Sequence, residues 1–170
     1  MSNLDPSYLY KGGSRWLLLA GGVIALDQWT KSLVTARLDE FESVVLLPIL
    51  DFMRLHNEGA AFSLLSDASG WQRWFFVIVG LVISGLIIVT LLRHSQSGRF
   101  FRLGLTLILG GALGNIIDRV YQGYVVDFVD LYWQAWHWPA FNIADVGITI
   151  GALIVLFEVS GSLRTTPGTS

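Results

Sequence analysis

Cysteine is absent from this chain of 170 residues, and charged residues are scarce. The lack of cysteine excludes disulfide bonds, thiolate catalysis and cysteine-based metal sites. The three histidines, His56, His94 and His137, are scattered and lack the spacing of metal ligands, so no metal or other cofactor is expected. Charged residues make up 14% of the chain, whereas a soluble domain carries about 25%. A net charge of −2 gives no reason to expect nucleic-acid binding.

Hydrophobic residues make up 53% of the chain instead, and they gather in long runs. A helix needs about 20 mostly apolar residues to cross a bilayer. Four segments meet this requirement and predict an all-α integral membrane fold with four transmembrane helices, at about residues 15–34, 71–92, 100–117 and 142–163. A soluble α/β domain is the alternative, but these runs lack the polar face that it requires.

The first segment also has a second interpretation, as a cleavable signal peptide. Lys11 and Arg15 precede a short apolar core, which is typical of such a peptide. Asp27, Gln28 and Lys31 argue against it, because a signal peptide is apolar or small at these positions. We therefore expect this segment to remain in the mature protein as a transmembrane helix.

Charge is distributed unevenly among the connections between the segments. The connection RHSQSGRFFR, residues 93–102, is basic and carries no acid, whereas the long connections at about 35–70 and 118–141 are rich in acids. By the positive-inside rule, both termini lie in the cytoplasm and the two long connections face outward. We expect one domain over residues 1–163, followed by a disordered tail over residues 164–170.

The first outer connection contains the run FESVVLLPILDFMRLHN, which is rich in Val, Leu, Ile and Phe and is broken by a proline. It predicts two short strands, at about 43–47 and 50–56, in an outer β element over about residues 41–66 that lies against the membrane surface. AAFSLL, within the same element, predicts a short helix in the membrane interface. The sheet and this helix are candidates for a clamp over a bound substrate.

Small residues four positions apart mark the last two apolar segments. Gly110 and Gly114 form one GxxxG pattern, and Gly147 and Gly151 form another. Helices in lipid depend on small residues for close contact, because lipid gives them no hydrophobic reason to associate. We therefore expect the third and fourth segments to pack closest.

Charged residues within apolar segments are costly and are functional candidates by default. LDQWTK places Asp27 and Lys31 four residues apart on one helix face, which predicts an internal salt bridge that holds this helix end. GGALGNIIDR places three polar residues at the outer end of the third segment. Asp118 and Arg119 are interpreted as a pair at the membrane interface, and Asn115 as a hydrogen-bonding brace.

VVDF and PAFNIAD carry the remaining polar candidates, Asp127, Asn142 and Asp145. Asp127 lies among apolar neighbours, and a lone buried carboxylate is costly or takes up a proton. Two carboxylates that share one proton avoid this cost, as in aspartic proteases, where one activates water and the other polarises the scissile carbonyl. In the alternative, Asn142 caps the fourth helix and Asp145 is a first-turn acid stabilised by the helix dipole. Since the chain offers no credible Ser–His pair, catalytic cysteine or metal set, paired aspartates are the chemistry that is left.

The motifs LDQWTK, HNEGAAF, GGALGNIIDR, VVDF and PAFNIAD, in this order and at these spacings, resemble the bacterial lipoprotein signal peptidases, also called signal peptidase II. The resemblance covers about residues 15–160. It implies an inner-membrane aspartyl endopeptidase with four transmembrane helices and a small periplasmic sheet. Such an enzyme removes the signal peptide of a prolipoprotein just before a cysteine that carries a diacylglyceryl group.

The resemblance also implies roles for individual residues. Asp127 and Asp145 match the catalytic dyad. Family positions that line the site, or close over it, correspond in this chain to Asn57, Gly59, Asn115, Arg119 and Asn142. Asp27, Lys31 and Asp118 match polar positions that are read as structural. The expected partners are a prolipoprotein with a lipidated cysteine and the membrane lipids, and the chain is expected to act as a monomer.

Two other functions are compatible with the residues alone. The first is a small transporter or proton channel, in which intramembrane acids relay protons; such proteins have inverted repeats and acids near the midplane. Here the acids gather at one end of the spans, and the two halves show no repeat. The second is a non-enzymatic lipid-binding module, which predicts that Asp127 and Asp145 are dispensable.

Overall fold

The computed structural model describes residues 13–59, 70–93 and 98–164 of the chain. The interfacial helix expected at AAFSLL lies outside the described residues, and so does the tail expected beyond Arg164. The remaining expected elements can be compared with the structure one by one.

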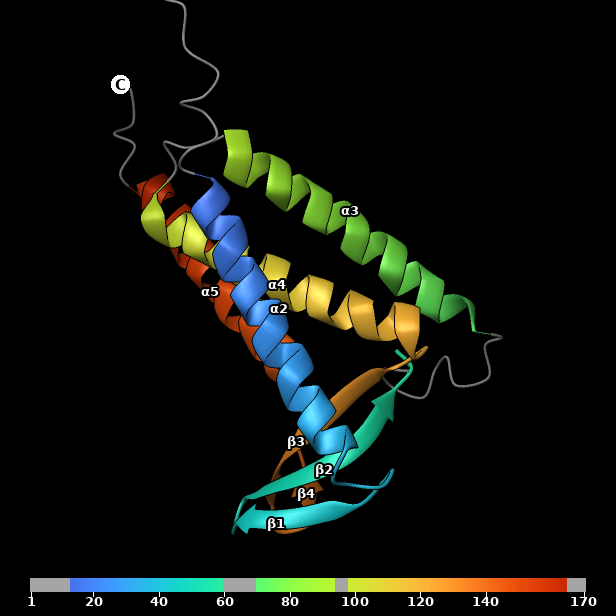
Figure 1. The fold of residues 1–170 in the computed structure, drawn as a ribbon. Helices are drawn as coiled ribbons and strands as arrows, with labels where there is room; N and C mark the ends of the chain where they lie inside the picture. The colour runs from blue at the N-terminus through green and yellow to red at the C-terminus, as the bar shows by residue number, and fades with distance from the viewer. Residues whose placement is uncertain (1–12, 60–69, 94–97, 165–170) are drawn as a thin grey trace, which may run out of the picture.

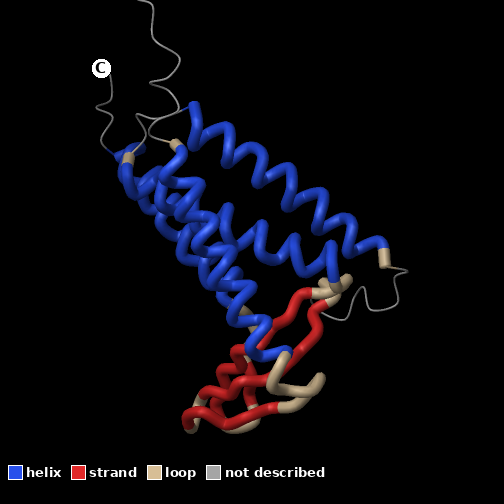
Figure 2. Tube along the Cα trace, viewed as in Figure 1, coloured by secondary structure: helices blue, strands red, loops and turns tan. Residues whose placement is uncertain are grey.

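The described residues form a bundle of helices with a small sheet at one end (Figure 1). The helices are α2 (Ser14–Thr35), α3 (Trp71–Arg93), α4 (Arg99–Tyr121) and α5 (Ile143–Arg164). The strands are β1 (Ser43–Leu47), β2 (Leu50–Asn57), β3 (Val125–Trp133) and β4 (Trp136–His137). The start of α2 and the end of α5 both lie at the end of the bundle away from the sheet, and the separation of helices from strands is plain in Figure 2.

Three of these helices are long and apolar enough to cross a membrane within the described part of the chain. They are Trp71–Arg93, Arg99–Tyr121 and Ile143–Gly161. The fourth, α2, has 22 residues, but its second half carries Asp27, Gln28 and Lys31, which lower its hydropathy. The helices therefore confirm the expected element order, and a transmembrane position for α2 stays a prediction.

The bundle is apolar on its outside and buries charged side chains beside an apolar core, unlike a soluble helical protein. Leu18, Leu86 and Phe157 are 78%, 64% and 77% exposed. Asp27 and Asp118, in contrast, are almost fully buried. Exposed apolar surface on this scale marks contact with a membrane or a partner. Lipid around the helices accounts for this distribution.

The sheet has the antiparallel order β1-β2-β3-β4. Strands β1 and β2 confirm the two strands expected from the sequence, with β2 one residue longer. No strand was predicted in the connection at residues 118–141, yet β3 and β4 lie within it. VVDFVDLYW is rich in β-branched and aromatic residues, so a strand signal was present in the sequence.

The helices pack through glycines, and α4 lies at the centre, with α3 on one side and α2 and α5 on the other (Figure 1). The contact between α4 and α5 is the most extensive, which confirms the expected closest pair. A Cβ added to Gly151 would lie 2.5 Å from the carbonyl oxygen of Gly104. The glycines used are only partly those expected, because Gly110 of α4 faces α2 and Gly114 lies closer to Asp27 of α2 than to Ala144 of α5.

This close approach predicts that Gly151→Ala destabilises the bundle. The added methyl meets backbone rather than a flexible side chain, so α4 and α5 must move apart, at about 1–3 kcal/mol for an overpacked site. Gly85→Ala in α3 is the matched control, because a Cβ there meets nothing within 4 Å. Thermal unfolding in detergent should show a lower midpoint for Gly151→Ala alone. Equal midpoints for the two variants would contradict the close α4–α5 contact.

Candidate active site

The candidate residues come together where the helices meet the sheet. Asp127 lies on β3, and Asp145 lies in the first turn of α5. Asn57 ends β2, while Asn115 and Arg119 belong to the last turns of α4. Five positions that are far apart in the sequence therefore meet at one end of the bundle.

The strand register explains how Asn57 reaches Asp127. Asn57 pairs with Val125, and side chains two residues apart on a strand share a face of the sheet. The Nδ2 group of Asn57 accordingly donates to Asp127 Oδ2 at 2.8 Å. On the other side, Phe141 forms an isolated bridge with Val129 of β3, which brings the following residue, Asn142, beside the strand.

Asp127 is 1% exposed, and both of its oxygens accept hydrogen bonds. Asn142 Nδ2 donates to Oδ1 at 2.7 Å, and Asn57 donates to Oδ2. Neither amide is free to turn, because the backbone N–H of Gly59 donates to Asn57 Oδ1 and that of Asp145 donates to Asn142 Oδ1. The two amides therefore present N–H groups, and not carbonyl oxygens, to Asp127.

Burial raises the pKa of Asp127 to about 6, because removal from water disfavours the charged carboxylate. The N–H groups of Asn57 and Asn142 act against this shift, while the charge of Asp145 adds to it. A carboxyl group with a pKa near neutrality can exchange a proton at physiological pH, which is a feature of catalytic acids and bases.

Asp145 is held by a reciprocal cap at the start of α5. Its backbone N–H donates to Asn142 Oδ1 at 3.0 Å, and the backbone N–H of Asn142 donates back to Asp145 Oδ2 at 3.2 Å. Asn115 Nδ2 donates to the other oxygen, Oδ1, at 2.9 Å. The capping interpretation is thus confirmed, and Asn142 contacts both aspartates, because its side chain donates to Asp127 Oδ1 and its backbone N–H donates to Asp145 Oδ2.

Glycine is required at position 59 for two reasons. Its φ of +91° lies in the region that L side chains rarely adopt. A Cβ there would also lie 2.6 Å from the ring of Phe76. That ring supports the guanidinium of Arg119, whose Cζ lies 4.9 Å from the ring centroid. Phe76 was not singled out in the sequence, where it is one of many aromatic residues in an apolar helix.

The predicted salt bridge between Asp27 and Lys31 forms at 2.8 Å. The predicted interfacial pair of Asp118 and Arg119 is wrong. Asp118 is 1% exposed and pairs with Lys31 at 2.8 Å instead. Gln28 was also missed as a site residue, although its Nε2 donates to Asp118 Oδ1 at 2.7 Å. Its place in LDQWTK, beside two charged residues in an apolar helix, was the available signal.

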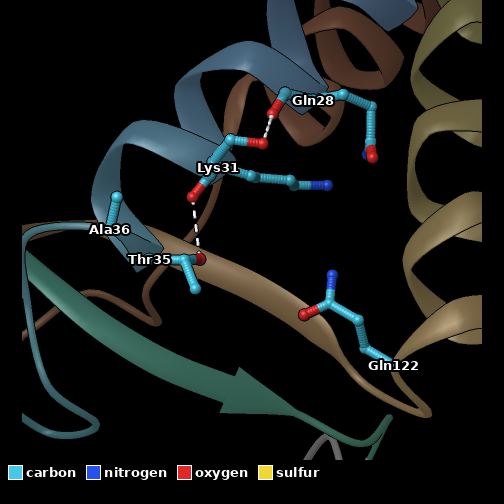
Figure 3. A pocket seen from close by; sticks show the side chains of 6 residues that line it. Gln28, Lys31, Thr35, Ala36 and Gln122 are labelled. Carbon is cyan, nitrogen blue, oxygen red and sulfur yellow. Dashed lines mark hydrogen bonds between the residues drawn. The ribbon is translucent and has the colours of Figure 1, made fainter.

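A cavity of about 290 Å³ adjoins this buried ion pair. It is lined by Gln28, Lys31, Ser32, Thr35, Ala36 and Gln122. Figure 3 shows Gln122, from the end of α4, facing the side of α2 that carries Lys31. The hydroxyl groups of Ser32 and Thr35 bond to backbone carbonyls of their own helix. The cavity thus reaches Lys31 between α2 and the end of α4.

The fold and the arrangement of this site place the chain among helical membrane enzymes. Two solved structures described as bacterial membrane enzymes are similar to it. One has a TM-score of 0.80 at 30% identity and covers 95% of this chain and 96% of its own. The other has a TM-score of 0.77 at 32% identity and covers 92% and 97%.

More closely, the chain belongs to the signal peptidase II family, whose model matches residues 19–160. A lipoprotein signal peptidase of Shewanella oneidensis is 49% identical over 146 residues, which is 86% of each chain. One from Shewanella baltica is 48% identical over 155 residues, and one from Acinetobacter baumannii is 49% identical over 143. These cover 90% and 84% of this chain, and 91% and 81% of their own. The resemblance drawn from the five motifs is confirmed, and the chain is a membrane-bound peptidase.

The raised pKa of Asp127 predicts a pH dependence of stability. Its value of about 6 in the folded protein lies above the ordinary 3.8, so the folded state binds this proton more tightly than the unfolded state. The cost of the buried charge is present in full above pH 6 and disappears as the pH falls through 6 toward 3.8. We expect the wild type to gain about 1.4 kcal/mol of unfolding free energy between pH 8 and pH 5 from this group.

Asp127→Asn is the comparison, because asparagine does not titrate. Thermal unfolding midpoints of both proteins in one detergent, at pH 8 and pH 5, give the two pH slopes. The wild type should be stabilised more on acidification than the variant. Parallel slopes, or a wild type that loses stability relative to the variant at pH 5, would show that the pKa of Asp127 is not raised.

Proposed function

We propose that the chain is an aspartyl endopeptidase that removes the signal peptide of prolipoproteins, cutting just before the diacylglyceryl-modified cysteine. The observation that carries this proposal is the pair formed by Asp127 and Asp145 about Asn142. The side chain of Asn142 donates to Asp127 Oδ1 and accepts from the backbone of Asp145. Two carboxylates held in this way can share one proton between them.

Hydrolysis follows from that shared proton. The ionised aspartate takes a proton from a water molecule as its oxygen attacks the scissile carbonyl carbon, and the protonated aspartate donates a hydrogen bond to the carbonyl oxygen. The tetrahedral intermediate then breaks its C–N bond, and the proton taken from water passes to the leaving amine. The pKa of Asp127, raised to about 6 chiefly by burial, fits a carboxyl group that gains and loses a proton in each cycle.

Arg119 is proposed to hold the substrate backbone. Its Nη1 donates weakly to the carbonyl oxygen of Asn115 at 3.4 Å, and its plane packs on Phe76. Within the described residues its buried Nε has no hydrogen-bond partner. A donor left unsatisfied in a buried site is costly, and a substrate carbonyl can satisfy it.

The membrane position of the site is part of the proposal. Trp71, Trp74, Trp133, Trp136 and Trp138 are all at least half exposed, and they come from the sheet and from the adjoining end of α3. Tryptophan favours the membrane–water interface, so a belt at this level places the site near the surface. We place the sheet in the periplasm and both termini in the cytoplasm of a monomer in the inner membrane. The lipidated cysteine can then stay in lipid while the peptide bond meets water.

Replacement of either aspartate tests the mechanism. Asp127→Asn and Asp145→Asn should each lower the rate of prolipoprotein cleavage by roughly 10²–10⁴-fold, the range for loss of a general acid or base. Asp130→Asn is the matched control, because Asp130 lies on the same strand and is buried but pairs with the exposed His137 at 2.7 Å. The assay uses purified protein in detergent with a diacylglyceryl-modified prolipoprotein, followed by the appearance of the shortened product.

A second substrate tests specificity in the same assay. A prolipoprotein with serine in place of the modified cysteine carries no lipid and should remain uncut.

Cleavage by Asp127→Asn at the wild-type rate would remove the aspartyl mechanism. Failure of the wild type, beside an active reference peptidase, would favour the lipid-binding module.

A further inference from the structure

Three charged side chains are buried behind the proposed dyad. Lys31 is 3% exposed, Asp118 is 1% exposed and Asp27 is fully buried. Lys31 Nζ lies 2.8 Å from a carboxylate oxygen of each acid. A buried ion group is a poor source of stability, because apolar side chains of similar volume often hold an interface as well or better. Its presence in an otherwise apolar bundle therefore points to a function.

Each acid of the group reaches the backbone next to one dyad residue. Asp27 Oδ1 accepts the N–H of Ala144, at 2.9 Å, and Ala144 directly precedes Asp145. Asp118 Oδ2 accepts the N–H of Val126, at 3.3 Å, and Val126 directly precedes Asp127. The two acids thus fix the backbone of the strand and of the helix that carry the dyad.

Lys31 also acts on the dyad through a third contact. Its Nζ donates to Asn115 Oδ1 at 3.0 Å. This contact holds the carbonyl end of the Asn115 amide toward Lys31, so that the N–H end faces Asp145 Oδ1 at 2.9 Å. The ammonium therefore uses all three of its N–H donors, one for each of Asp27, Asp118 and Asn115.

We propose that Lys31 is a positioning residue for hydrolysis, whose ammonium sets the separation and orientation of the two dyad carboxylates. The inference rests on the proposed aspartyl mechanism. Through Asp118 it holds β3, through Asp27 it holds α5, and through Asn115 it orients the Asp145 carboxylate. A dyad that acts on a single water molecule needs such fixed geometry, because small displacements of reacting groups lower the rate strongly.

The proposal separates Lys31 from a residue that only stabilises the fold. Loss of a positioning residue lowers the kcat of the molecules that are folded while KM changes little, because the substrate is still bound but the dyad is misaligned. Loss of a purely structural residue lowers the amount of folded enzyme instead, and the molecules that remain folded keep their kcat. The cavity beside Lys31 allows the two cases to be told apart chemically.

The first experiment uses Lys31→Met, which keeps the volume and removes the charge. Its kcat for the lipidated prolipoprotein should fall about 10- to 100-fold. Losses of this size follow when a residue that hydrogen-bonds and orients a metal ligand is removed. KM should stay within about threefold of the wild type, since a kcat effect alone marks loss of transition-state geometry. Ser32→Ala is the matched control, because Ser32 lines the same cavity and bonds only to its own helix. That variant should keep the wild-type kcat.

The second experiment uses Lys31→Ala, which enlarges the cavity of about 290 Å³ seen in Figure 3. Ethylammonium added to the assay should enter it, replace the three N–H donors and restore kcat in a saturable way. Tetramethylammonium carries the same charge but no N–H group, so it should give no rescue. Asp127→Asn should not respond to either amine, because its defect lies in the dyad itself.

The outcomes distinguish the inference from the mechanism on which it rests. An inactive Asp127→Asn with a fully active Lys31→Met would overturn the positioning role and leave the aspartyl mechanism in place. A second result would also overturn it. If the apparent kcat of Lys31→Met fell only as far as its folded fraction fell, and neither amine restored the activity of Lys31→Ala, Lys31 would serve stability alone. Full activity of Asp127→Asn would remove the mechanism itself.

Discussion

Lipid around the bundle leaves its interior polar groups with only one another as partners, and this constraint shapes the rest of the structure. A polar group in hydrocarbon must be satisfied within the protein. Here Asp27, Lys31 and Asp118 satisfy one another between α2 and α4. Asp27 Oδ1 and Asp118 Oδ2 also accept backbone N–H groups from the two elements that carry the proposed dyad, and Gln28 donates to Asp118 Oδ1. The contacts that satisfy the buried charges are therefore the same contacts that hold the site together.

Helix packing through glycine serves this site as well as the fold. A Cβ at Gly114 would lie 2.6 Å from Asp27 Oδ2, so only glycine lets α2 bring this carboxylate so close to α4. A Cβ at Gly111 would lie 2.3 Å from the carbonyl oxygen of Ala144, at the start of α5. The small residues thus bring three helices close enough for side chains as short as aspartate and asparagine to connect them.

Much of the fold follows from the sequence because its signals are local. The apolar runs and the strands β1 and β2 have the expected places, with ends that differ by a few residues. No strand was predicted at β3, although VVDFVDLYW has the composition of a strand. The α4–α5 contact was expected, but which glycines face which helix depends on the rotation of α4, and helix length and composition do not determine that rotation.

Most residues that meet at the site were singled out in the sequence, apart from Gln28 and Phe76, but most of the contacts among them were not predicted. Asp118 and Arg119 are adjacent in the sequence, which suggested a pair, yet adjacent residues on a helix point in different directions. Asp118 turns into the bundle toward Lys31, and Arg119 turns toward α3, where it packs on Phe76. Contacts such as that of Asp27 with Ala144 join residues more than a hundred positions apart. No local pattern records such a contact.

The proposed dyad is divided between a strand and a helix, so its geometry depends on how these two elements are joined. Asp127 lies on β3, whereas Asp145 lies in the first turn of α5. The side chain of Asn142 contacts both carboxylate-bearing elements at the front of the site. Backbone hydrogen bonds between β3 and Phe141, which precedes Asn142, belong to the same front attachment. The ion group around Lys31 adds a second attachment for each element at the back, and two attachments on each side fix the angle between the carboxylates as well as their distance.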